Sequence, residues 1–215
     1  MPAGLFAGAT IAALFSAPFS TYGPSVIVNP PPDKIVIEIA TVNGSGCPQG
    51  TAAVAVSPDN TAFTVTYSDY LAQVGLGSKP TDARKNCQLN LIVHVPQGFT
   101  YAIASADYRG YAQLEDGAIG AEKASYYFQG QSQTVPSIHN FKGAYADNWQ
   151  ATDQVDIASL VWAPCGEQRN FNINTELRVN AGTSDPAKTT SYMTMDSTDG
   201  NLNTIYHLAW KECPK

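Results

Sequence analysis

An aromatic and polar segment near the middle of the chain is the strongest candidate for a ligand-binding site. It combines rings with hydrogen-bonding groups, carried by Tyr145, Asp147, Asn148, Trp149 and Gln150. This combination suits a sugar, because its C–H faces stack on rings while its hydroxyl groups take polar partners. We expect the segment to lie in a long loop within residues 130–154, since loops on rigid β-scaffolds commonly carry function. The alternative, slightly favoured by the burial preference of tryptophan, is that Trp149 closes the end of the core.

Paired carboxylates would support a different chemistry, the hydrolysis of glycosidic bonds. That reaction needs two acids roughly 5–10 Å apart across a cleft. The candidates are Glu115, Glu122, Asp147, Asp153 and Glu176. Their spacing selects no pair, so a hydrolase that acts on an extracellular polysaccharide remains the alternative function.

Nucleophilic and metal chemistry find less support. The chain has no Gly-x-Ser-x-Gly motif, and its histidines, His94, His139 and His207, are far apart in sequence. Asp196 and Asp199 flank a Gly-containing turn that would suit Ca²⁺ if backbone carbonyls joined them. A plain hairpin turn selects the same residues, and we favour the turn. We expect no cofactor and lean against an enzyme.

The four cysteines indicate an oxidising compartment, because disulfides are rare in the cytosol. No Cys-x-x-Cys motif is present, which argues against zinc knuckles and thioredoxin-type chemistry. Three pairings are possible. We favour Cys47–Cys87 and Cys165–Cys213, because each cysteine lies at the end of a predicted strand and each pair closes one half of the chain.

Composition narrows the class of protein further. The 215 residues are 44% hydrophobic and only 14% charged, with a formal net charge of −6. Scattered cations on an acidic chain argue against nucleic acid and anionic membranes as partners. Low charge with many Gly, Tyr, Thr and Asn is typical of short strands and turns rather than long surface helices.

The elements that must position these residues are strands. Residues 170–179 alternate most cleanly, with Phe171, Ile173, Leu177 and Val179 on one face. The pattern predicts an antiparallel, jelly-roll-like β-sandwich of about ten strands. The expected strands are 34–42, 51–56, 62–67, 89–95, 99–114, 123–129, 155–162, 170–179, 190–195 and 204–210.

Turns and interruptions complete this prediction. The second and third strands should form a hairpin, as should the last two. Residues 75–86 are expected to form a loop, and Gly110 should mark a bulge or bend within the long strand 99–114.

The N-terminal part of the chain divides into three predicted regions. Residues 1–20 resemble a signal peptide, 21–33 form a Pro-rich spacer, and 34–215 form a single domain. The apolar run is too short and too rich in Gly and Ala for a transmembrane helix, so the mature protein should have no stable membrane span. No Lys or Arg precedes Lys34, so the basic region of a signal peptide is missing. A buried N-terminal helix is the alternative.

Short stretches spread over the domain carry a resemblance to a known family. They are Gly44-Ser-Gly-Cys-Pro48, Lys85-Asn-Cys87, Asp107-Tyr-Arg-Gly110, Asp147-Asn-Trp149, Ala163-Pro-Cys-Gly166, Asn172-Ile-Asn174 and Tyr192-Met-Thr-Met-Asp-Ser-Thr-Asp-Gly200. With them the chain resembles the secreted domain-of-unknown-function family 4360 of actinomycetes and filamentous fungi. The resemblance implies export, a small β-rich domain and paired cysteines. It supplies no catalytic residues.

The sequence is therefore compatible with three functions. The first is a secreted binding or surface-interaction module that contacts an extracellular glycan or cell-surface component through residues 145–150. The second is the hydrolase described above. The third is a secreted structural or inhibitory protein.

Overall fold

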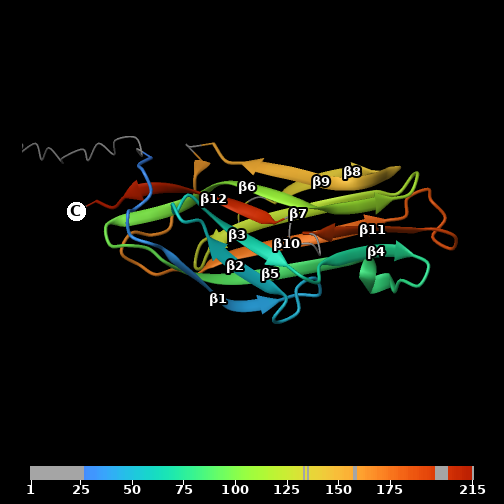
Figure 1. Ribbon diagram of the computed structural model, residues 1–215, viewed down its shortest axis with the longest axis horizontal. Coiled ribbons are helices and arrows are strands. Elements are labelled where there is room, and N and C mark those ends of the chain that lie inside the picture. Colours follow the sequence, from blue (N-terminus) through green and yellow to red (C-terminus); the bar gives the residue numbers. More distant parts are fainter. Residues whose placement is uncertain (1–26, 133, 135, 157–158, 197–202, 215) are drawn as a thin grey trace, which may run out of the picture.

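The protein is a β-sandwich of two antiparallel sheets whose strands run roughly along its long axis (Figure 1). The computed structural model describes residues 27–132, 134, 136–156, 159–196 and 203–214. The signal-like residues 1–20 and the first part of the spacer lie outside these residues. The rest of the predicted spacer contacts the sandwich, where the amide of Val28 donates to the carbonyl of Trp210 at 3.0 Å. Among the described residues, no helix is long and apolar enough to cross a membrane.

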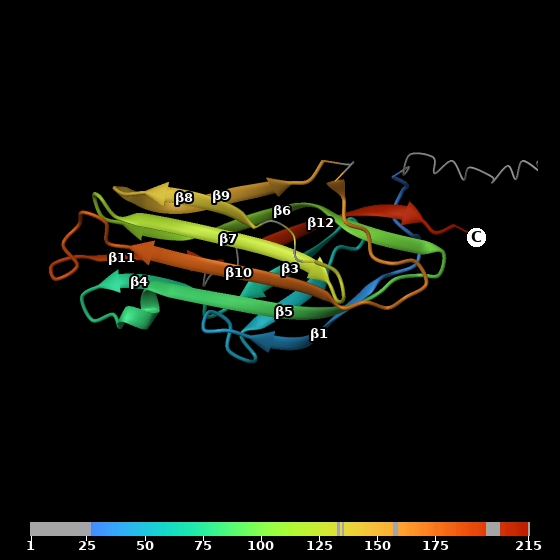
Figure 2. The same cartoon turned by 180° about the vertical axis from the view of Figure 1, so that it is seen from behind.

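One layer is a five-stranded sheet, which is nearer the viewer in Figure 2. In spatial order its strands are β1 (Val36–Asn43), β5 (Arg84–His94), β10 (Phe171–Asn180), β7 (Ile119–Phe128) and β8 (Ser137–Lys142). The alternation predicted at residues 170–179 is confirmed in β10, because Phe171, Ile173, Leu177 and Val179 are all buried. Its other face is polar and lies on the outside of the sandwich.

The other layer is a seven-stranded sheet built around the long strand β6 (Phe99–Leu114). The remaining strands are β2 (Ala52–Val56), β3 (Ala62–Tyr67), β4 (Leu71–Gly75), β9 (Tyr145–Gln154), β11 (Thr190–Met195) and β12 (Thr204–Glu212). Along one edge, β6 pairs first with β12 and then with β11. Its opposite edge pairs with β9 over ten residues. A short 3₁₀ helix, η1 (Pro80–Ala83), precedes β5.

The core lies between the sheets and is rich in aromatic rings. Its largest fully buried side chains include Trp149, Trp210, Tyr108, Tyr206 and Phe63. Both predicted disulfides are confirmed, Cys47–Cys87 and Cys165–Cys213, and the described part of the chain has no free cysteine. The all-β sandwich prediction is confirmed, and so is the first predicted hairpin, formed by β2 and β3.

Four predictions about loops, turns and bulges are wrong. The expected loop 130–154 contains β8 and β9, and the expected loop 75–86 contains η1 and the first residues of β5. The last two strands do not form a hairpin, because β11 and β12 follow one another along the same edge of β6. At Gly110 the pairing of β6 with β9 continues without a register shift, so the bulge that was one of the two expected features is absent there.

The segment 155–162 was predicted to be a strand, but its described residues are not part of one. Leu160 instead packs on Ala102 and Ala209, whose side chains it buries on the seven-stranded sheet. Trp162 packs against the same cluster. The apolar run therefore covers a sheet rather than extending one.

Candidate functional site

The predicted ligand-binding segment is strand β9, and the strand divides its residues between two faces. Asn148 and Gln150 lie opposite Tyr111 and Arg109 of β6, on the outer face of the seven-stranded sheet. Trp149 between them points inward and is 2% exposed. Because strand side chains alternate, the predicted group of five residues cannot act as one surface.

Trp149 is a core residue. Its indole Nε1 donates to the carbonyl oxygen of Thr194 at 3.1 Å, and its ring lies 5.2 Å from that of Phe141. A Cβ atom at Gly110 would come within 2.8 Å of the indole and 1.9 Å of the Thr194 oxygen. Glycine at position 110 therefore makes room for the tryptophan, and the ring is not available to a ligand in this structure.

The other predicted residues of β9 remain at the surface. Asp147 is exposed, and its Oδ1 accepts a hydrogen bond from the backbone N–H of Asn148 at 2.7 Å. The Tyr145 hydroxyl donates to the carbonyl oxygen of Asn148, also at 2.7 Å. Asn148 thus has a fixed backbone and an exposed amide.

The aromatic rings beside Asn148 come from two other strands. Tyr111 of β6 pairs with Asn148 on one side and with Thr194 on the other, and all three face outward. The Tyr111 and Tyr192 rings are 6.0 Å apart between centroids and inclined by 34°. Both rings are partly exposed. They form an aromatic platform, a term used below for Tyr111 and Tyr192 together.

A surface hollow of about 500 Å³ lies over this platform. Polar groups line it beside the two rings, and they are Ser68, Asp69, Asn148, Thr194 and Asp196. The site predicted from the sequence includes Asn148 but not Tyr111 or Tyr192. Tyrosine is common along the strands of this chain, and only the pairing of β9 and β11 with β6 brings these two rings to Asn148.

Asp196 forms part of the base of the hollow and is 2% exposed. Its Oδ2 accepts the N–H of Tyr67 at 2.6 Å, and its Oδ1 accepts the hydroxyl of Thr204 at 3.4 Å. Burial outweighs these bonds and raises the pKa of Asp196 to about 7.

The calcium alternative gains no support from this geometry. Asp196 turns inward to bind backbone and hydroxyl groups, and Asp199 lies outside the described residues. Within the described ranges, no three His, Cys, Asp or Glu side chains are placed to share a metal ion.

A second polar group lies further along the same outer face. Asp107 accepts the hydroxyl of Thr152 at 2.6 Å and lies 3.1 Å from Nε2 of His207. Partial burial raises the pKa of Asp107, but the bonds from Thr152 and His207 outweigh it and lower the pKa below its ordinary value. Ser105 is the ladder partner of His207, and no side-chain hydrogen bond joins the two among the described residues, so His207 is paired with Asp107 alone.

The candidate catalytic carboxylates are dispersed, except for two in the core. Glu122 pairs across the ladder with His139, whose Nε2 is 2.8 Å from Oδ1 of Asp153. Asp153 also accepts the hydroxyl of Tyr126 at 3.3 Å. Glu122 is 0% exposed and Asp153 only 7%, so neither can reach a polysaccharide.

Glu122 has an unusual environment within this core. Neither of its carboxylate oxygens has a hydrogen-bond partner among the described residues. Burial, together with the charge of Asp153, raises the pKa of Glu122 well above its ordinary value. The side chain is therefore held neutral rather than as a catalytic anion.

The comparisons with known sequences agree with a family of unknown function. A family model described as "Domain of unknown function (DUF4360)" matches residues 33–213. A relative from Arthroderma benhamiae, described as an uncharacterized secreted protein, is 39% identical over 184 residues, which is 86% of this chain and 74% of the relative. Among solved structures, the enzymatically active domain of bacteriophage CBA120 tailspike protein 4 aligns with a TM-score of 0.28 and 12% identity. That alignment covers 80% of this chain and 19% of the tailspike chain.

Proposed function

The chain belongs to the family described as Domain of unknown function (DUF4360), and we propose that it is a secreted module that binds a neutral polysaccharide. The binding site is the hollow over the aromatic platform of Tyr111 and Tyr192. Asn148 is the member of the sequence-predicted site that contributes directly to it. The secreted relative and the two disulfides support an extracellular role.

The observation that carries this proposal is the relation between the two rings. At 6.0 Å and 34°, Tyr111 and Tyr192 form a gently angled surface on one face of the sheet. Sugar rings present flat C–H faces that pack on such aromatic surfaces, and neighbouring rings contact successive sugar units. A pair of part-exposed tyrosines on a rigid sheet also needs little ordering when a ligand binds.

The polar groups around the platform match hydroxyl groups. Asn148 supplies both a carbonyl acceptor and an amide donor, and Thr194 adds a hydroxyl on the same face. Asp69 also lines the hollow, and its carboxylate repels anionic ligands. The site therefore favours a neutral glycan over an acidic one.

Binding rather than hydrolysis fits the placement of the carboxylates. Glu122 and Asp153 are enclosed in the core, and Glu176 faces outward on the opposite sheet. Asp69 and Asp196 line the hollow, but both oxygens of Asp196 already accept hydrogen bonds, from Tyr67 and Thr204. This arrangement does not supply the acid and base of a glycosidase.

A glycan array with the full chain tests the proposal, followed by calorimetry with the best oligosaccharide. Tyr111→Ala and Tyr192→Ala should each weaken binding by about tenfold, which is roughly 1.4 kcal/mol. Tyr127→Ala is the matched control, because Tyr127 is a partly exposed tyrosine on the five-stranded sheet. Absence of binding to every neutral glycan, or equal effects of all three substitutions, would overturn the proposal.

A further inference from the structure

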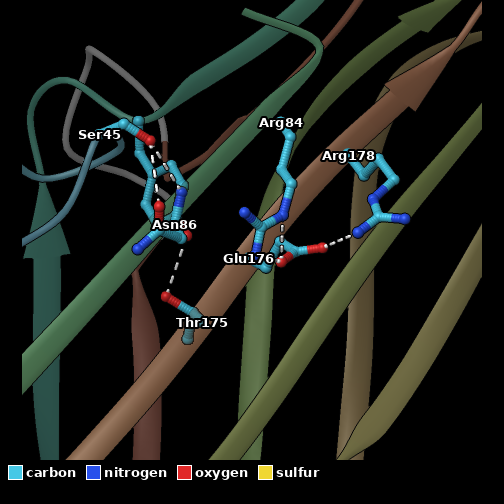
Figure 3. Close-up of polar contacts among 7 residues, drawn as sticks. Ser45, Arg84, Asn86, Thr175, Glu176 and Arg178 are labelled. Atoms are coloured by element: carbon cyan, nitrogen blue, oxygen red, sulfur yellow. Dashed lines mark hydrogen bonds and ion pairs between the residues drawn. The ribbon is translucent and has the colours of Figure 1, made fainter. Parts of the chain in front are cut away.

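The outer face of the five-stranded sheet carries a compact group of cations around one carboxylate. Arg84 of β5 and Arg178 of β10 are direct ladder partners, so two like charges lie side by side. Glu176 bridges them: Nε of Arg84 donates to Oε2 at 2.7 Å, and a terminal nitrogen of Arg178 donates to Oε1 at 2.7 Å (Figure 3). Lys123 of β7 is the ladder partner of Glu176 on its other side.

The two guanidinium groups are anchored yet open to solvent. The side chains of Arg84 and Arg178 are 58% and 57% exposed, whereas that of Glu176 is 12% exposed. Partial burial raises the pKa of Glu176, but the bonds from Arg84 and Arg178 outweigh it and lower the pKa. Each guanidinium group has five N–H donors in a fixed plane, so most of them remain for a ligand.

Two hollows adjoin this group, one of about 250 Å³ and one of about 420 Å³. Lys123 and Glu176 line both, so the hollows meet at the charged centre. Amide side chains line part of the remainder, and they are Asn86, Gln88, Asn140, Asn174 and Asn180. The larger hollow is also lined by the exposed apolar side chains of Ile119 and Ile138. Asn86 is itself positioned by Ser45, whose hydroxyl donates to Oδ1 at 3.2 Å (Figure 3).

The local charge is opposite in sign to that of the whole chain. Three cations surround a single anion here, although the protein carries a formal net charge of −6. Like charges placed directly opposite in a sheet are destabilising, and Glu176 offsets this repulsion while it leaves most of the guanidinium donors free. Guanidinium groups with free donors recognise carboxylates in a bidentate manner, and amides recognise hydroxyl groups.

We infer that this face is a second binding site, and that it takes a polysaccharide bearing carboxylate groups, such as a chain of uronic acids. The carboxylate binds the exposed N–H donors of Arg84 and Arg178 that Glu176 leaves free, beside Lys123, and the flanking sugar units occupy the two hollows. A nucleic acid fits less well, because its dense phosphates need many cations and are repelled by the acidic remainder of the protein.

This inference is independent of the proposed function. The two sites lie on opposite sheets and share no residue. Either site can therefore bind its ligand when the other does not.

Affinity of the full chain for soluble polygalacturonate, measured by calorimetry beside neutral dextran, tests the inference. The double variant Arg84→Gln/Arg178→Gln should bind at least tenfold more weakly, and added salt should weaken the wild type. The matched control is Arg169→Gln/Lys188→Gln, which removes the same charge from exposed ion pairs elsewhere. If the double variant fails to fold, Lys123→Gln should show a smaller loss in the same direction.

Three outcomes would overturn the inference. The first is that polygalacturonate binds no more tightly than dextran. The second is that the control double variant loses as much affinity as the Arg84→Gln/Arg178→Gln variant. Equal affinity for DNA of similar length would show a surface that attracts any polyanion rather than a site for acidic sugars.

Discussion

The indole nitrogen of Trp149 lies 3.1 Å from the carbonyl oxygen of Thr194, and this bond links the two strands that flank β6. It passes beneath Gly110, where any Cβ atom would collide with both groups. The segments around these three residues also carry the family resemblance, and the fold brings them together. Because the contact fixes the register of β9 and β11 on the inner face, it also fixes Asn148, Tyr111 and Thr194 on the outer face.

Replacement of this tryptophan should separate structure from binding. Trp149→Phe removes the hydrogen bond and leaves a buried carbonyl oxygen with a lost partner, so unfolding should become easier by about 1–3 kcal/mol. Glycan affinity of the folded protein should change by less than about twofold, because the ring does not reach the hollow. Urea unfolding and calorimetry measure the two effects. A large loss of affinity with unchanged stability would contradict the core role assigned to Trp149.

The buried Glu122 should make the protein less stable as pH rises. Its pKa in the folded protein is well above the ordinary value of 4.5, so the folded state keeps a proton that the unfolded chain releases. The stability that the protonated Glu122 contributes is therefore fully present below pH 4.5, and it is lost as pH rises toward the pKa of the folded state. Tyr67, Tyr108, Tyr126, Tyr206, His139 and Asp153 surround the carboxyl group.

Glu122→Gln removes the titrating group while preserving shape. Chemical unfolding of both proteins between pH 4 and pH 8 should show a shallower decline for the variant. If the free energies of unfolding of the wild type and the variant changed in parallel over this pH range, Glu122 would ionise without any loss of stability. That result would contradict the burial of its two unpartnered oxygens.

Asp196 should contribute to the same decline. Its pKa is raised from 3.8 to about 7, so its contribution is lost as pH increases from about 4 to about 7. The shift corresponds to at most about 4 kcal/mol. Asp196→Asn keeps an acceptor for the N–H of Tyr67 and cannot ionise. We expect the variant to be about as stable as the wild type at pH 4 and more stable at pH 8, measured by thermal unfolding. A variant that is less stable at pH 8 would show that the ionised carboxylate is favourable.

The predictability of this fold differs among its strands for physical reasons. β10 was evident because its inward positions are large and apolar. β9 was missed because its inward positions include Ala151 and Asp153 beside Trp149, so its hydrophobic pattern is weak. Asp153 is tolerated there because His139 and Tyr126 bind it. Both partners belong to other strands, and their approach is not visible in the local sequence.

The candidate site was only partly predictable for a related reason. The chemistry expected of residues 145–150, a ring beside amides, is present on the surface, but the rings belong to Tyr111 and Tyr192. The alternation of β9 turns Trp149 inward and Asn148 outward, and this consequence needed the strand assignment. The pairing of β6 with β11 joins residues about eighty positions apart, which no local pattern reveals.

The most direct test of a polysaccharide site on the aromatic platform is a nuclear magnetic resonance titration. Full-length, isotopically labelled protein would be titrated with the best neutral oligosaccharide from the array, and amide shifts mapped on the structure. We predict that the largest changes cluster at Tyr111, Asn148, Tyr192 and Thr194, and that Tyr111→Ala abolishes them at the same ligand concentration. Changes confined to other surfaces, or unchanged in the Tyr111→Ala variant, would contradict the account.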